Sequence, residues 1–244
     1  IPNAGLEYNI TSIIKKLVDK NKKTVGIATL GNQDIKTENI SELLRQTYNV
    51  RNIDLSIEVS SEIEVILISG VEDSISIEEV NNLDAFIKRG GNIFIGQNRI
   101  KTDLQTQSAE EIQSNIFGFL ERYGLGIRSN LVLDSQSGQI SVLQNRGIFR
   151  MQSAVDYPFF PLVRNFASDQ VVVNSLEQVR TLFPSEIWEH KDTLELNKSS
   201  IFSSLSFTPL FFTSNKSGTM EQFFSLNPVQ NPAFNTLNES KKTL

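Results

Sequence analysis

The sequence predicts an α/β fold built on a mainly parallel sheet with helices on its faces. Three observations lead to this prediction. Up to residue 96, apolar segments of strand length alternate with segments of helical periodicity. The segment VILIS at 65–69 is apolar throughout, as a strand covered on both faces would be. After residue 136 helical periodicity fades and short β-like runs follow. We therefore expect a flavodoxin- or Rossmann-like sheet with a β-rich C-terminal half.

The strands of the predicted parallel sheet are short apolar runs separated by helices. They span residues 24–30, 50–55, 65–69 and 92–96. A lead-in helix is expected over 8–21, because its apolar residues recur at positions 0, 3, 4, 7 and 8 of one helical face. A shorter helix is expected over 38–47, between the first two strands.

Residues 76–89 carry the strongest helix pattern in the chain. Ser76 followed by Glu79 forms a capping-box sequence, in which each side chain bonds the backbone N–H of the other residue. A cationic last turn precedes Gly90 and Gly91, and glycine after such a turn ends a helix in the left-handed conformation. We expect Gly90 to have a positive φ, with Gly91 as the alternative.

The rest of the chain is predicted as one further helix followed by strands. The helix is expected over 109–123, with Glu110 and Glu111 in its first turn, and a strand follows at 131–133. The β-like runs are 139–143, 147–151, 171–173, 180–183 and 200–206. The predicted organisation is a lead-in helix (1–23), an α/β core (24–135) and a β-rich segment (136–244) packed on that core in the same structural unit.

Composition excludes several classes of function. A net charge of −5 lacks the basic surface that nucleic acid requires. The chain has no cysteine and one histidine, His190, so we expect no metal site, no cofactor and no enzyme activity. His190 is interpreted as an ordinary surface residue among charged neighbours. Residues 91–98 (GNIFIGQN) have the glycine spacing of a phosphate-binding loop, but Gln97 stands where that loop needs lysine.

Polar side chains follow the ends of the predicted parallel strands. Asn32 and Gln33 follow the first strand, and Gln97 and Arg99 follow the strand at 92–96. In open α/β sheets, ligands bind beyond the carboxyl ends of the strands. These four residues are therefore candidates for binding a small polar ligand such as a saccharide.

The segment YPFFPLV at 157–163, followed by Arg164, is a second candidate site. Its two prolines forbid a helix interior, so the aromatic side chains project from an extended segment. It is interpreted either as a plug that closes the core or as a contact surface for a partner or a second copy of the chain. Contact would involve Tyr157, Phe159, Phe160 and Arg164. Because adjacent residues of an extended segment point to opposite sides, we expect Phe159 or Phe160 to face outward.

Several segments together resemble GldG-type proteins, the auxiliary components of ABC-2-like exporters implicated in bacterial gliding motility. The resembling segments, in chain order, are LDAFIKRGGNIFIG (83–96), LERYGLGIRSNLVLD (120–134), DYPFFPLVRNF (156–166) and PLFFTSNKSG (209–218). The α/β portion of that family is similar in turn to a domain of eukaryotic intraflagellar-transport proteins.

The resemblance implies a non-enzymatic accessory domain on the periplasmic side of the cytoplasmic membrane. It implies helices before and after the domain that anchor it, and partners among the permease and ATPase subunits of an ABC transporter. Because the chain begins with Ile1 and contains no apolar run of roughly 20 residues, we expect these anchors to lie outside it. The alternative is the ligand-binding module described above.

Overall fold

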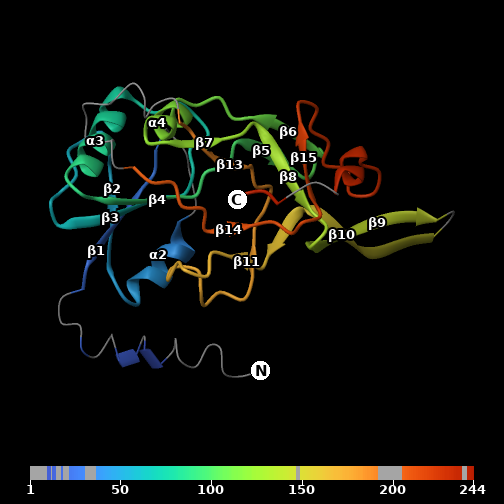
Figure 1. Ribbon diagram of the computed structural model, residues 1–244, viewed down its shortest axis with the longest axis horizontal. Coiled ribbons are helices and arrows are strands. Elements are labelled where there is room, and N and C mark those ends of the chain that lie inside the picture. The colour runs from blue at the N-terminus through green and yellow to red at the C-terminus, as the bar shows by residue number, and fades with distance from the viewer. Residues whose placement is uncertain are drawn as a thin grey trace. The chain divides into compact units, whose positions relative to one another are not determined.

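The computed structural model describes residues 10–11, 13–14, 18, 22–30, 37–146, 149–191, 205–237 and 241–244 (Figure 1). The chain forms two compact units, Ile1–Gln97 and Asn98–Leu244. Most of the predicted lead-in helix, and the turn that contains Asn32 and Gln33, lie outside the described residues.

The first unit contains the predicted parallel sheet. Its strands are β1 (Thr24–Ala28), β2 (Asn49–Ile53), β3 (Ile63–Ile68) and β4 (Asn92–Ile95). They lie in the order β2-β1-β3-β4, and all three pairings are parallel. The prediction of a parallel sheet from these four segments is therefore confirmed.

Strand β3 lies inside the sheet, between β1 and β4. Ile66 and Ile68 are fully buried, and Leu67, whose side chain points to the other face, is 8% exposed. Both faces of β3 are thus covered, as the unbroken apolar run predicts.

The helices of this unit include α2 (Glu38–Arg45) and α3 (Ile77–Lys88). The capping box at the start of α3 is confirmed, because the Glu79 N–H donates to Ser76 Oγ (3.1 Å) and the Ser76 N–H donates to Glu79 Oε2 (2.7 Å). The predicted left-handed glycine is also confirmed, since Gly90 has φ +93°. Leu83 and Phe86 are the buried residues of α3.

The predicted helix over 109–123 is wrong in its first half. Instead, β5 (Ile100–Asp103) and β6 (Ser108–Glu111) form an antiparallel hairpin, and helix α4 is shorter (Ile116–Arg122). Pairing with β5 therefore outweighs the helix propensity of the sequence AEE. As a consequence Glu110 and Glu111 lie in a strand, not in the first turn of a helix.

The second unit is rich in antiparallel strands, as its sequence predicts. These are β7 (Leu125–Ile127), β8 (Asn130–Asp134), β9 (Ser137–Arg146), β10 (Phe149–Val163), β11 (Asn165–Phe166), β12 (Val179–Arg180), β13 (Ile187–Glu189), β14 (Phe211–Phe212) and β15 (Ser217–Glu221), followed by a 3₁₀ helix, η2 (Pro232–Thr236). Residues 98–135, which the sequence groups with the α/β core, belong to this unit. Among the described residues, the parallel arrangement is found in β1 to β4 alone.

The predicted β-like runs have different outcomes. Residues 139–143 lie in β9. Of the run 147–151, residues 149–151 lie in β10, and residues 147–148 lie outside the described residues. The run 171–173 is wrong: Val173 and Asn174 donate backbone hydrogen bonds to the Gln170 carbonyl and form a turn. Three consecutive valines favour a strand only where a neighbouring strand can pair with them. Of 180–183 only Arg180 is in a strand. The part of 200–206 that is described, residues 205–206, has no strand.

The core of the second unit forms around the inner end of β10. Tyr157 and Phe159 are fully buried, together with Leu131 and Leu133 of β8. The Tyr157 hydroxyl donates to the Leu226 carbonyl (2.8 Å). Burial raises the pKa of this hydroxyl well above its usual value, so it remains a donor. This bond attaches the segment after β15 to the core.

The two glycines after α3 give a stability prediction. At Gly90 an added Cβ would meet nothing within 4 Å, so Gly90→Ala should cost only the left-handed backbone energy of about 1 kcal/mol. At Gly91 an added Cβ would overlap the buried Phe86 ring, so Gly91→Ala should cost more, ~1–3 kcal/mol. Urea denaturation of the two variants measures both costs. A loss of unfolding free energy for Gly90→Ala that equals or exceeds the loss for Gly91→Ala would contradict the assignment of Gly91 as the more tightly packed position.

Candidate functional site

The amide of Gln97, a predicted ligand-binding group, is engaged inside the first unit. Its Oε1 accepts from the Val71 N–H and its Nε2 donates to the Val71 carbonyl, both at 2.8 Å. Val71 is 1% exposed. The side chain thus satisfies two buried backbone groups, as a neighbouring strand would.

Arg99, a second predicted ligand-binding group, is also held internally. Its Nη2 lies 2.5 Å from Glu111 Oε1, and its guanidinium carbon lies 3.8 Å from the centre of the Phe117 ring. The ion pair and the cation–π contact together fix the guanidinium against α4 and β6. Asn32 and Gln33, which complete the predicted set, lie outside the described residues.

The predicted contact segment divides into an inner and an outer part. Tyr157 and Phe159 are fully buried. Phe160 is half-buried, with its ring 5.0 Å from that of Tyr157 and 5.1 Å from that of Phe183. Arg164 is exposed, and its Nε and Nη2 donate to Gln178 Oε1. Of the four predicted contact residues, Phe160 and Arg164 are therefore the two that retain solvent-exposed surface.

His190 is half-buried, rather than fully surrounded by solvent as its charged neighbours suggest. Its ring lies 5.0 Å from that of Trp188, and Nδ1 is buried with no hydrogen-bond partner. Within the described part of the chain, no three His, Cys, Asp or Glu residues come together as a metal site would require.

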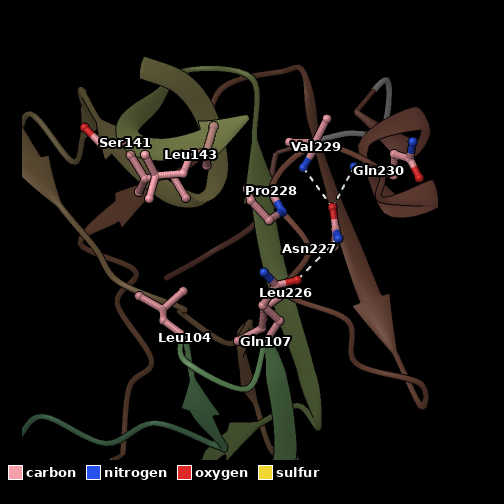
Figure 2. A pocket seen from close by; sticks show the side chains of 11 residues that line it. Leu104, Gln107, Ser141, Leu143, Leu226, Asn227, Pro228, Val229 and Gln230 are labelled. Carbon is pink, nitrogen blue, oxygen red and sulfur yellow. Dashed lines mark hydrogen bonds between the residues drawn. The ribbon is translucent and has the colours of Figure 1, made fainter. Parts of the chain in front are cut away.

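A groove that no sequence motif indicates runs beside β9. It has a volume of about 550 Å³ and is formed by three segments of the second unit. These are the β5–β6 turn with Leu104 and Gln107, residues 140–143 of β9, and residues 226–230 (Figure 2). We call this feature the β9 groove.

The wall opposite β9 is held by hydrogen bonds. Asn227 Oδ1 accepts from the N–H groups of Val229 (3.0 Å) and Gln230 (2.8 Å), and Asn227 Nδ2 donates to Gln107 Oε1 (3.3 Å; Figure 2). The Leu226 N–H donates to the carbonyl of Gln107, which has φ +55°. Because side-chain and backbone bonds both fix this wall, the groove is formed before any ligand arrives.

The lining of the β9 groove is uncharged and largely apolar. Leu104, Leu143 and Val229 are 48%, 75% and 54% exposed. The polar lining groups are amides and one hydroxyl, that of Ser141, and none is an acid, a base or a cation. The groove is therefore suited to binding by shape and backbone hydrogen bonds, and has no residues for proton transfer.

One sequence signal marks this region. No charged residue occurs from Ser135 to Asn145, although 21% of the chain is charged. The partners Leu104 and 226–230 come from distant parts of the chain, so the sequence alone does not indicate a groove.

No helix in the described part of the chain has the length and apolar character needed to cross a membrane.

Comparison with known proteins adds a relative and a structural neighbour. The chain is 25% identical over 229 residues to an uncharacterized protein of Borreliella burgdorferi, covering 90% of this chain and 42% of that protein. The chain thus spans less than half the length of this curated relative. It is also similar to the solved structure of the mmIFT52 N-terminal domain, with 13% identity, a TM-score of 0.49, and coverage of 89% of this chain and 83% of that one.

A family model adds a match over nearly the whole chain. It is described as an ABC-type uncharacterized transport system, and it matches residues 22–244. Both compact units fall within that match. The chain therefore belongs to the auxiliary protein family of this ABC-type transport system.

Proposed function

We propose that this chain is a non-enzymatic accessory domain that acts in an ABC-type transport system by contacting other proteins. The observation that carries the proposal is the contrast between the predicted polar ligand site and the apolar β9 groove. Gln97 and Arg99 are bonded to Val71 and Glu111, whereas the β9 groove presents an uncharged apolar lining to solvent. Surfaces of this kind favour protein partners.

The proposed setting is the periplasmic side of the cytoplasmic membrane, within a protein that helices outside this chain anchor to it. The resemblance to GldG-type proteins supports this setting and a role in an exporter related to gliding motility. The partners would be the permease and ATPase subunits, reached through the full-length protein, with self-association as the alternative contact.

The second candidate function is binding of a small polar ligand, such as a saccharide, at the carboxyl ends of the parallel strands. It would use Asn32, Gln33, Gln97 and Arg99. For Gln97 to take part, its amide would have to exchange two bonds with buried backbone groups for bonds with the ligand. That cost favours the protein-contact function.

Association with a transporter can be tested by co-purification of the full-length, membrane-anchored protein. We expect permease and ATPase subunits to co-purify with the wild-type protein. Smaller amounts should co-purify with the Phe160→Ser variant, which removes a half-buried ring from the proposed contact surface. Phe160→Ser should lower the free energy of unfolding less than Phe159→Ser, which removes a fully buried ring at a cost of about 3–5 kcal/mol.

The matched variants separate contact from folding. Arg164→Ser, at an exposed position of the same segment, provides a third variant that preserves the core. Absence of any transporter subunit from the wild-type preparation would contradict the proposed function. Unchanged co-purification with both Phe160→Ser and Arg164→Ser would remove this segment from the contact surface.

The role of Gln97 separates the two candidate functions. If its amide is structural, Gln97→Ala leaves the buried N–H and carbonyl of Val71 without partners and lowers the free energy of unfolding by ~1–3 kcal/mol. Asn81→Ala, at an exposed amide of α3, is the control and should leave stability unchanged or slightly higher. Unchanged stability of Gln97→Ala, together with lost saccharide affinity, would favour the ligand-binding function instead.

A further inference from the structure

The β9 groove runs along an open sheet edge. The three-stranded sheet has the order β12-β10-β9, so β9 is its outermost strand. Successive side chains of a strand point to opposite faces, yet the four consecutive residues from Ile140 to Leu143 all line the groove. Side chains from both faces of β9 can line one groove only if that groove lies along the edge of the strand.

The edge offers unpaired backbone groups. In an antiparallel pair, alternate residues direct both N–H and C=O toward the partner strand, and the residues between them direct both groups away from it. Residues 139–143 of β9 pair with 152–156 of β10 on one side. The described residues supply no backbone hydrogen bond to 139–143 on the other side. An extended polypeptide is the ligand whose donors and acceptors match such an edge.

This edge also lacks the usual protection against pairing. Native sheet edges are commonly blocked by charged side chains, by proline or by bulges. From Ser135 to Asn145 the sequence contains no charge and no proline. By contrast, β10 carries Arg150, Asp156, Pro158 and Pro161.

We infer that the β9 groove binds an extended segment of another protein, which adds to the sheet as a strand beside β9. The segment is uncharged and alternates apolar with small polar side chains, because the lining is uncharged and apolar groups dominate it. Four residues of a strand span ~13 Å and match the four residues of β9 that line the groove. The inference deepens the proposed function and rests on it for its biological setting.

A second copy of this chain fits the groove less well. The open edge of its own β9 is the edge that residues 226–230 flank, so two such edges cannot approach each other without displacing both walls. The sequence of its β10 includes Arg150 and Asp156, and the groove lining contains no opposite charge for either. We therefore assign the groove to a different protein.

The test uses the 244-residue chain and capped heptapeptides in which Val, Ile, Leu or Phe alternates with Thr. Peptide binding is followed by NMR of the labelled chain. We expect at least one peptide to shift the backbone amides of 139–143, 226–227 and 229–230. N-methylation of alternate residues removes the donors from one edge of the peptide. We expect one methylated set to bind about tenfold more weakly and the other set to bind as before.

Two variants provide the matched comparison. Leu143 and Gln152 are register partners on neighbouring strands and both are exposed, but only Leu143 lines the groove. Leu143→Lys should weaken peptide binding about tenfold, because a charge beside an edge strand opposes pairing. Gln152→Lys adds the same charge one strand away and should leave binding unchanged.

Three results would overturn the inference. They are the absence of any shift with all peptides at millimolar concentration, equal effects of the two N-methylated sets, and equal effects of Leu143→Lys and Gln152→Lys. Sedimentation that shows a dimer, lost in Leu143→Lys, would assign the edge to a second copy. The peptide test can fail while transporter subunits still co-purify, and it can succeed while they do not, so the two failures are distinguishable.

Discussion

The fold of the second unit depends on β10, a strand that pairs with β9 along its outer part and packs into the core along its inner part. The outer part of β10, up to Asp156, pairs with β9 in a two-stranded arm (Figure 1). From Tyr157 onward the strand enters the core, where Tyr157 and Phe159 are fully buried. The register with β9 shifts between Asp156 and Pro161. Prolines at 158 and 161 donate no backbone hydrogen bond, so the hydrogen-bond ladder with β9 is interrupted where β10 enters the core.

This change of environment determines the surroundings of the β9 groove. The Tyr157 hydroxyl, carried into the core by β10, holds the carbonyl of Leu226. The residues that follow, 226–230, form the wall that faces β9. Strand β10 therefore pairs with one edge of β9 and also positions the segment that flanks the other, open edge. A groove with one mobile and one fixed wall would lose more entropy when it binds a segment than one that is preformed on both sides.

Local patterns in the sequence predict the first unit well, because its strands and helices follow one another along the chain. The capping box at Ser76 and the glycine at 90 each involve groups within a few residues of one another, and both are confirmed. The second unit is harder to predict, because β6 is stabilised by a hairpin partner and β8 pairs with the distant β15. The groove is hardest of all, since Leu104, Ile140 and Leu226 meet only after the whole unit has folded.

The candidate sites show how the same residue types serve stability or recognition according to what surrounds them. Gln97 and Arg99 follow strand β4, where ligands often bind, but the Gln97 amide is bonded to backbone groups of Val71 and Arg99 Nη2 is paired with the carboxylate of Glu111. Residues 139–143 contain no group that suggests chemistry, yet their outer backbone edge has no partner among the described strands. Unpaired backbone groups beside apolar side chains have a strong preference for one kind of ligand, another extended chain. In this protein the recognition surface is therefore better identified from incomplete backbone pairing than from reactive side chains.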